Sequence, residues 1–247
     1  MTITFNDNNT MSYGIKLHVW GDYACFTRPE LKAERMTYEV MTPSAARGIL
    51  TAIYWKPEFR WVVDRIHVLN PIEFGQIRRN EVENKVAPPS AAVMRGEKTY
   101  STQFFIEENR QQRAMTYLRR VAYVIEAHVE VLHEQEGINN IAKHLEMFKR
   151  RASNGQCFHH PCLGMREFLA SFSLVDEEHP APPCQLPPEQ RNRNLGLMLH
   201  DMVYTDDRKG TVICAHTGKK QSVTPKFFMA ELRDGVLDLP PLNRALS

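Results

Sequence analysis

A strand and a capped helix near the N-terminus constrain the fold more than any other feature of this chain. Residues 15–20 alternate apolar and polar side chains, which is typical of a half-buried strand. Thr42 is a favourable N-cap residue, and Pro43 suits the first helical position. Before Pro57, apolar residues recur at helical spacing, namely Ala46, Ile49, Leu50 and Ile53. The sequence therefore predicts a strand and then an amphipathic helix.

Three later segments are predicted to be strands as well. Residues 60–69 and 121–132 are rich in apolar and β-branched side chains, which favour extended structure. Residues 165–174 are predicted to form the fourth strand of the same unit. The stretch between the second and third strands contains Pro88-Pro89-Ser90, and we expect it to be an irregular insert.

A second helix is predicted between the third and fourth strands. Asn139 or Asn140 can cap its start, and Asn154-Gly155 marks its end. Its apolar stripe is formed by Ile141, Leu145, Phe148 and Ala152. The order β-α-β-β-α-β predicts an α+β fold of the ferredoxin-like class, which RNA-recognition folds also use.

The domain organisation follows from these elements. We expect a ferredoxin-like domain over residues 13–175 with an insert at about 73–118, and a flexible segment over residues 1–12. Residues 176–194 contain five prolines and are predicted to form a linker or long loop. A small antiparallel sheet is expected as a C-terminal extension over 195–240, with strands at 195–204, 210–216 and 225–232 and a turn at Asp234-Gly235.

Composition excludes several classes of protein. With 43% hydrophobic and 24% charged residues, the chain is typical of a soluble globular protein. No apolar run approaches the roughly 18 residues of a membrane span, and the N-terminus lacks a signal-peptide core, so we expect a cytoplasmic location. The five cysteines are odd in number and lack paired two-residue spacing, so a disulfide framework is not expected.

One short segment raises the alternative of a zinc site. It offers four potential ligands within six residues, Cys157-Phe158-His159-His160-Pro161-Cys162. A structural zinc site normally draws its ligands from two separated pairs, and Pro161 restricts how so short a loop can fold around an ion. We therefore expect neither a metal nor another cofactor.

Basic residues gather in clusters although the net charge is only +2. Such clusters can bind the phosphates of RNA, or they can simply be solvated surfaces. Arg47 lies two turns before Tyr54 on the same flank of the first predicted helix, where it could contact an RNA backbone. The candidate RNA-binding residues are Arg47, Arg78, Arg79, Arg113, Lys149, Arg150 and Arg151.

Lys143 and His144 are the candidate catalytic residues of the second predicted helix. We expect them in its first turn, where unpaired N–H groups and the helix dipole favour an anion such as phosphate. At 100° per residue their side chains diverge, with Lys143 opposite the apolar stripe and His144 beside it. The alternative is one solvated lysine and one histidine packed at the edge of the core.

Two separated stretches resemble one known family. These are residues 14–30 with the helix end Tyr54-Trp55-Lys56-Pro57, and Ala142-Lys143-His144-Leu145 with Arg150-Arg151-Ala152. They resemble the CRISPR-associated RAMP endoribonuclease of subtype I-C, the Dvulg variant of the fifth Cas family. The similarity covers residues 13–71, 78–82, 109–128 and 143–172 and fades in the proline-rich and C-terminal parts. A glycine-rich loop near the C-terminus, usual in other RAMP nucleases, is missing, which favours the subtype I-C variant.

The resemblance implies a function and a site. The family cuts CRISPR repeat RNA without a metal and matures the guide RNA, and its catalytic tyrosine, lysine and histidine match Tyr54, Lys143 and His144. Which of the three is acid and which is base stays open. The resemblance further implies that the protein stays on the guide RNA's 5′ handle beside the backbone and large subunits of the type I-C interference complex, with double-stranded DNA as a further candidate partner. The alternative is a non-catalytic subunit that only binds guide RNA or DNA.

The expected fold geometry does not favour Tyr54 in that site. We expect the two helices to run roughly parallel, which would separate the end of the first helix from the start of the second. Tyr54 would then lie away from Lys143 and His144. A tyrosine packed at the edge of the core is the alternative.

Overall fold

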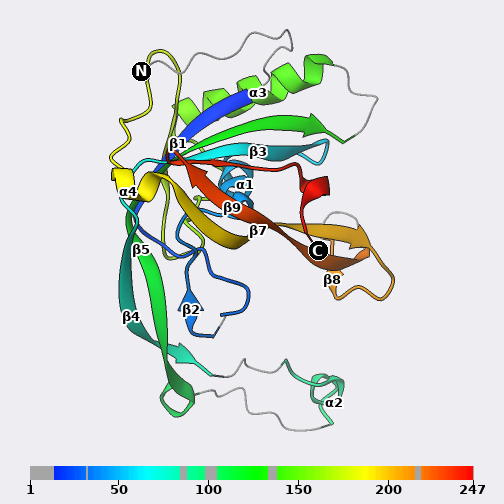
Figure 1. The fold of residues 1–247 in the computed structure, drawn as a ribbon. Helices are drawn as coiled ribbons and strands as arrows, with labels where there is room; N and C mark the ends of the chain where they lie inside the picture. Colours follow the sequence, from blue (N-terminus) through cyan, green and yellow to red (C-terminus); the bar gives the residue numbers. More distant parts are fainter. Residues whose placement is uncertain are drawn as a thin grey trace.

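The computed structural model describes residues 14–31, 33–83, 88–97, 105–132, 138–214 and 218–246. It is a mixed α/β fold built on a mostly antiparallel sheet with few helices (Figure 1). The strands are β1 (Gly14–Ala24), β2 (Arg35–Met36), β3 (Phe59–Val68), β4 (Glu73–Val82), β5 (Arg110–Val131), β6 (Ser171–Leu174), β7 (Arg193–Asp206), β8 (Val212–Ile213), β9 (Lys220–Arg233) and β10 (Val236–Asp238). The helices are α1 (Pro43–Ile53), α2 (Ala91–Met94), α3 (Ile138–Ser153) and α4 (Pro188–Arg191), with short 3₁₀ turns η1 (Ile106–Asn109) and η2 (Leu242–Arg244).

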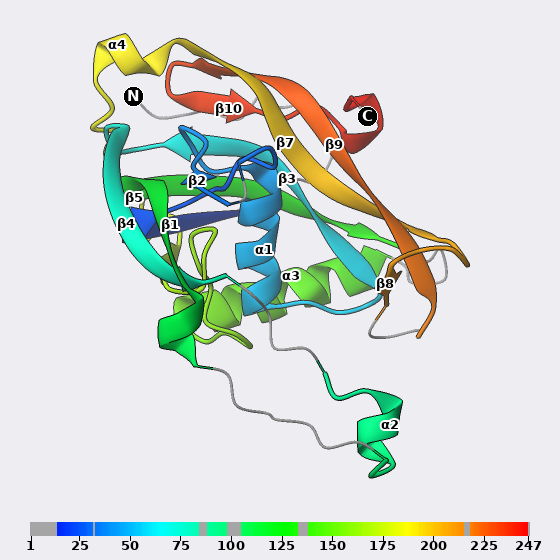
Figure 2. The same ribbon diagram turned by 90° about the horizontal axis from the view of Figure 1, so that it is seen from below.

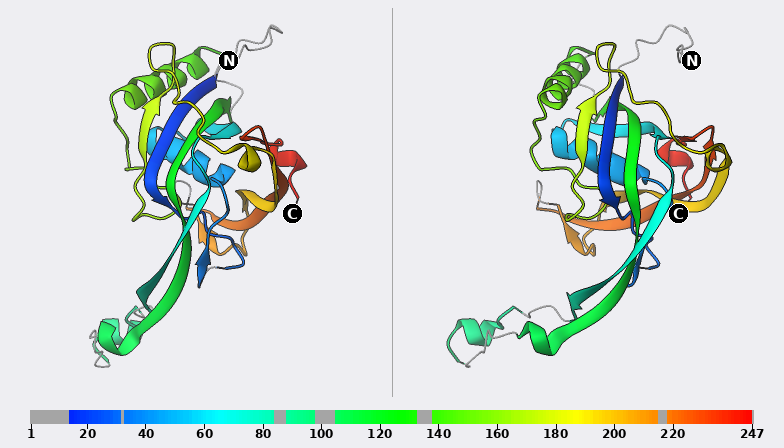
Figure 3. Two further views of the ribbon diagram at one scale, coloured as in Figure 1. Left: turned by 60° about the vertical axis from the view of Figure 1, so that its left-hand side comes forward. Right: turned by 90° about the vertical axis from the view of Figure 1, so that its left-hand side faces the viewer.

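The central path of the sheet runs β6-β1-β5-β3-β10-β9-β7. All neighbours along this path are antiparallel, and the short β2 pairs with β5 in parallel. β5 is the central element because it pairs with β1 on one side and β3 on the other. The two long helices, α1 and α3, pack on one face of this part of the sheet (Figure 3, right).

Both long helices bury the apolar stripes that the sequence predicts. In α1, the Thr42 hydroxyl accepts a hydrogen bond from the backbone N–H of Ala45, and the four stripe residues are all buried. In α3, the buried part of the stripe is Leu145, Phe148 and Ala152, and the Phe148 ring packs 4.7 Å from that of Trp61 on β3. The side chains of residues 138–140, including both candidate N-cap asparagines, lie outside the described part of the chain.

The C-terminal strands extend the same sheet beyond β3. A turn at Asp234 and Gly235, with φ of 48° and 77°, connects β9 to β10, and β10 pairs with β3. In Figure 1, β7 and β9 cross in front of α1, and Figure 2 shows the same pair passing beside that helix. Met198 on β7 and Phe228 on β9 join the core that α1 and α3 share. The C-terminal strands therefore bury the face of α1 that the first part of the sheet leaves uncovered.

The stretch expected to be an irregular insert is largely a long hairpin, so that expectation is wrong. β4 pairs with the first half of β5 from Glu73↔Arg119 to Val82↔Arg110, and this hairpin arm projects away from the body of the protein (Figure 3). Arg120, with a positive φ of 49°, lies where β5 passes from the arm into the central sheet, and its carbonyl accepts a hydrogen bond from the Asn70 side chain. One continuous strand thus serves both the arm and the core.

Two predicted strands are shorter in the structure. Of residues 165–174, only Ser171–Leu174 forms a strand, because the preceding chain turns through an isolated bridge between Cys162 and Leu169. Of residues 210–216, only Val212–Ile213 pairs with β9, and residues 215–217 lie outside the described part of the chain. Within the described residues, no helix has the length and apolar character needed to cross a membrane.

Candidate active site

The end of α1 and the beginning of α3 lie at the same end of the central strands β3 and β5. Phe59 at the start of β3 pairs with Val131 at the end of β5. Because α1 ends shortly before β3 and α3 begins shortly after β5, the two helix ends meet there. The expected separation is wrong. β1 and β5 run in opposite directions, and so the helices that follow them leave the sheet in opposite directions too.

Tyr54 and His144 form a hydrogen bond at this meeting point. The Tyr54 hydroxyl lies 2.9 Å from His144 Nδ1, and the two residues are only 3% and 7% exposed. Tyr54 caps α1, since its N–H donates to the Leu50 carbonyl and its own carbonyl accepts from the Trp61 indole. The Phe59 ring lies 4.8 Å from the His144 ring. Contacts from α1, β3 and α3 therefore fix the pair.

Two charged residues flank this pair. Glu58 Oε2 lies 3.9 Å from His144 Nε2, and the Arg151 guanidinium lies 5.1 Å from the centre of the Tyr54 ring while donating to the Ile53 carbonyl. Burial raises the pKa of Tyr54, and Arg151 and Glu58 act on it in opposite directions, Arg151 lowering it and Glu58 raising it. Tyr54 is therefore a neutral phenol at physiological pH, and its hydroxyl can either donate to Nδ1 or accept from it. In both cases Nε2 is the ring nitrogen that Tyr54 does not contact.

Lys143 lies one position before His144 and is exposed to solvent. Its side chain makes no hydrogen bond or ion pair with another residue that the structure describes. Because α3 begins at Ile138, Lys143 and His144 are in its second turn and not in the first. The predicted anion site at unpaired N–H groups is therefore wrong for these two residues, since N–H groups beyond the first four are bonded within the helix. The divergence of the two side chains, one exposed and one buried, is confirmed.

The candidate RNA-binding residues fall into three groups. Arg47 on α1 forms a two-bond ion pair with Asp201 on β7, with one N–O distance of 2.8 Å. On the hairpin arm, Arg79 is paired with Glu81 and Glu167, whereas Arg78 is exposed without a hydrogen-bonding partner among the described residues. Arg113 lies opposite Arg79 in the arm and donates to Gln111. Their role in RNA binding stays a prediction.

The third group lies on α3. Lys149 is 3.4 Å from Glu146 within the same helix, and Arg150 is exposed near the sulfur of Met147. Arg151 instead faces inward against Tyr54. Glu58 and Phe59, which lie beside His144, were not predicted as site residues. The feature of the sequence that could have indicated them is their position directly after Tyr54-Trp55-Lys56-Pro57.

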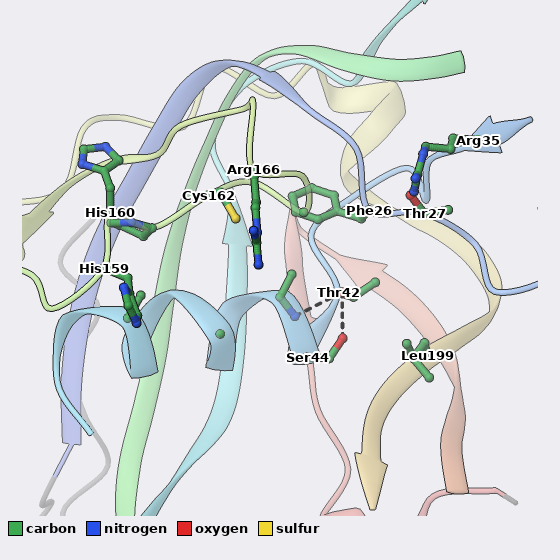
Figure 4. A pocket seen from close by; sticks show the side chains of 15 residues that line it. Phe26, Thr27, Arg35, Thr42, Ser44, His159, His160, Cys162, Arg166 and Leu199 are labelled. Carbon is green, nitrogen blue, oxygen red and sulfur yellow. Dashed lines mark hydrogen bonds between the residues drawn. The ribbon is translucent and has the colours of Figure 1, made fainter. Parts of the chain in front are cut away.

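A pocket lies along α1. It is an open pocket of about 910 Å³ on the side of the loop that carries His159, His160 and Cys162 (Figure 4). Phe158 and His159 both direct their backbone N–H groups at the Ala52 carbonyl, which fixes this loop to α1. Among the described residues, no group of three or more His, Cys, Asp or Glu side chains is arranged to hold a metal ion.

Comparison with known proteins identifies relatives over nearly the whole chain. The model of a family described as CRISPR-associated protein (Cas_Cas5) matches residues 14–240. A protein named CRISPR pre-crRNA endoribonuclease Cas5d from Mannheimia succiniciproducens is 50% identical over 94% of this chain and 96% of its own length. A protein of the same name from Thermus thermophilus is 41% identical over 92% of this chain and 91% of its own.

Solved structures share the fold. The functionally uncharacterized protein SMU1763c from Streptococcus mutans superposes with a TM-score of 0.60 at 20% identity, over 95% of each chain. A structure described as a CRISPR-associated protein superposes with a TM-score of 0.55 at 22% identity, over 94% of each chain.

Proposed function

The chain belongs to the Cas5 family of CRISPR-associated proteins, and on that basis we propose that it is a metal-independent endoribonuclease that cleaves CRISPR repeat RNA. Two relatives at 50% and 41% identity carry the name pre-crRNA endoribonuclease. The observation that carries the proposal is the hydrogen bond between Tyr54 and His144, next to the exposed Lys143. After cleavage, the protein keeps the guide's 5′ handle as a subunit of the type I-C interference complex, beside its backbone and large subunits, with double-stranded DNA as a further candidate partner.

The proposed scaffold is a ferredoxin-like unit. The order β1, α1, β3, β5, α3, β6 supports it, with β6-β1-β5-β3 adjacent in the sheet and both helices on one face. The domain would span residues 13–175, the hairpin arm would be the insert at about 73–118, and the strands within 195–240 would extend the sheet. In such a split βαβ arrangement, the C-terminus of the first helix and the N-terminus of the second lie at the same end of the strands, where the proposed site lies.

The proposed reaction uses a nucleophile that RNA supplies itself. The 2′-oxygen attacks the adjacent phosphorus, its proton passes to a base, and the 5′-oxygen of the next nucleotide leaves with a proton from an acid. The products are a 2′,3′-cyclic phosphate and a 5′-OH. Two proton transfers and one stabilising cation suffice, and no metal is required.

Each of the three residues has a role in this proposal. His144 is the base: in the tautomer whose Nδ1–H donates to the Tyr54 oxygen, Nε2 is unprotonated and takes the proton of the 2′-OH. Lys143 is the cation for the charge that develops on the phosphorane oxygens, and its ammonium group donates the proton that the leaving 5′-oxygen takes. Tyr54 acts as a positioning residue that fixes the orientation and tautomer of the imidazole. Glu58, 3.9 Å from Nε2, is close enough to interact with a proton held there.

Cleavage should persist without divalent metal ions. We expect the purified protein to cut its own repeat RNA at one position at the same rate in excess EDTA as in buffer with Mg²⁺, because side chains supply the acid, the base and the cation. The measurement is a single-turnover time course on end-labelled RNA. Loss of cleavage in EDTA that returns with Mg²⁺ would contradict the proposal.

The hydrogen bond to His144 should matter for the rate. We expect Tyr54→Phe to lower the single-turnover rate roughly tenfold and to change the shape of its pH profile, because a hydrogen bond worth about 1 kcal/mol no longer orients the imidazole. Tyr38→Phe is a matched control, since Tyr38 is also buried and its hydroxyl accepts a hydrogen bond from Leu199 on β7. If both variants keep the wild-type rate and pH profile, Tyr54 has only a structural role.

The rival function is guide-RNA binding without chemistry. The burial of Tyr54 and His144 favours it, because a catalytic group must reach the substrate. The presence of a lysine and a histidine next to each other favours the enzyme. The time course in EDTA separates the two, since the rival leaves repeat RNA intact under every condition.

A further inference from the structure

The pocket along α1 is built from segments that are far apart in the sequence. One side of α1, from Ser44 to Ala52, forms its floor, and the loop carrying residues 159–166 and the segment around Phe26 and Arg35 form its walls. In Figure 4, Arg166 extends from its loop toward the first turn of α1, and Arg35 approaches from the side of β2. Neither Tyr54 nor His144 lines this pocket, and Arg166 faces the end of α1 that is far from that pair.

Its lining is cationic and rich in hydroxyl groups. The lining includes two arginines and two histidines but no carboxylate, and its hydroxyl groups come from Thr27, Thr42 and Ser44. Neither Arg35 nor Arg166 makes a hydrogen bond or ion pair with another described residue, and Nε of Arg35 is buried without a partner. The adjacent acid, Glu167, is paired with Arg79 of the hairpin arm, and the charge of Arg35 also helps to lower its pKa. Two arginines thus face one pocket whose lining contains no carboxylate.

The wall that carries Arg166 is rigid. Gly164 has a φ of +85°, and a Cβ there would lie 2.1 Å from the Cys25 carbonyl oxygen, so only glycine fits. Both backbone polar groups of the preceding residue, Leu163, are hydrogen-bonded. Its N–H donates to the Phe168 carbonyl, and its carbonyl accepts from the Cys25 N–H. The pocket is therefore formed before any ligand arrives, which lowers the entropic cost of binding.

We propose that this pocket binds a phosphate group of the single-stranded repeat RNA, at a position separate from the cleavage site. Guanidinium groups match the oxygens of phosphate in geometry and charge. The inference rests on the proposed function, because it takes RNA as the ligand. Ser44 and Tyr54 are ten positions apart, or about 15 Å along α1. At about 3.4 Å per stacked nucleotide, the bound phosphate lies no more than about five nucleotides from the cut.

Removing Arg166 should weaken binding in a salt-dependent way. The probe is repeat RNA with one 2′-deoxy nucleotide at the cut site, titrated at several salt concentrations. We expect Arg166→Gln to lower the affinity and to reduce the slope of log K against log salt by about 0.7, the value for one phosphate contact on a single strand. Arg208→Gln is the control, since Arg208 is also exposed, lies outside the pocket, and has no hydrogen-bonding partner among the described residues. An unchanged slope for Arg166→Gln overturns the proposal.

Gly48 provides a second, independent variant. It lies in the pocket floor, and a Cβ added there meets no atom within 4 Å. Gly48→Glu would place a carboxylate in the pocket, whereas Gly48→Gln places a neutral group of the same size. We expect only the glutamate variant to lose RNA affinity. Equal affinity of the two variants speaks against an anion in the pocket.

Neutral phosphate analogues distinguish RNA from a small anion. Single methylphosphonates are placed one at a time in the probe RNA, and each is measured with wild type and Arg166→Gln. At one position, within about five nucleotides of the cut, we expect the methylphosphonate to lower the affinity of the wild type but not that of Arg166→Gln. Two groups that contact each other are coupled in this way. If no position couples, and inorganic phosphate at matched ionic strength raises the thermal unfolding temperature of wild type only, the pocket binds a small anion and the proposal fails.

The failure of this inference can be told apart from failure of the proposed function. With cleavable RNA, Arg208→Gln should follow the wild-type rate at every protein concentration, whereas Arg166→Gln should need more protein to reach its maximal rate, because the contact acts on binding. If the wild type never cleaves but the methylphosphonate coupling is found, the phosphate site stands and the enzyme proposal fails. If the wild type cleaves and no coupling is found, only the phosphate site is rejected.

Discussion

A repeat RNA with a single 2′-deoxy nucleotide at the cut site is expected to bind normally and to remain uncleaved. The proposed mechanism takes its nucleophile from the 2′-OH, and no side chain or water replaces it at the phosphorus. Binding survives because most contacts to single-stranded RNA are to phosphates and bases, which the substitution leaves in place. The rate should fall below detection, the largest effect that we predict.

The measurement is a single-turnover time course beside a binding titration with the same RNA. The matched control carries the deoxy nucleotide one position away from the cut and should be cleaved at the wild-type rate. Cleavage of the RNA with the deoxy nucleotide at the cut itself would rule out attack by the 2′-oxygen and with it the roles proposed for His144 and Lys143.

Removing His144 or Lys143 is expected to lower the single-turnover rate by roughly 10² or more, with a much smaller change in RNA affinity. Proton transfer by His144 and charge stabilisation by Lys143 act mainly in the transition state, so their loss appears in the rate and not in binding. The variants are His144→Ala and Lys143→Ala. We expect each variant to cut at the same position but slowly, and to bind the RNA at the protein concentrations at which the wild type binds it.

His144 is buried, so its replacement needs a control for stability. His200 on β7 is buried to a similar degree, at 8% exposure against 7%, and its Nε2 donates to the Pro240 carbonyl. His200→Ala should destabilise the protein comparably while leaving cleavage intact, as thermal unfolding and the time course will show. Wild-type cleavage by both the His144 and the Lys143 variants would move the protein to the rival class, a subunit that binds guide RNA without chemistry.

Local patterns predicted most of the elements that carry the site. The cap at Thr42 and the stripe that follows it define α1, and the stripe ending at Ala152 defines the buried face of α3. The same periodicity placed His144 toward the core and Lys143 toward solvent. These features depend only on residues three or four positions apart, and they can therefore be predicted from the sequence.

The ion pairs of the basic residues could not be predicted in this way. The position of Arg47 on the predicted helix indicated contact with an RNA phosphate. In the fold, Arg47 is instead paired with Asp201, 154 positions away. Arg79 is likewise paired with Glu167 through a hairpin arm that was expected to be irregular. Whether an arginine is available to RNA depends on which carboxylates the fold brings near it, and no local pattern contains that information.

Helical periodicity alone predicts a histidine at the edge of the core with a lysine facing solvent beside it. The contact of that histidine with Tyr54, 90 positions earlier, follows from the fold. The reason is the direction of the strands: β5 runs antiparallel to both β1 and β3, so the chain returns to the edge where α1 ends before it enters α3. Strand direction is set by long-range pairing, which side-chain periodicity within a single segment does not record.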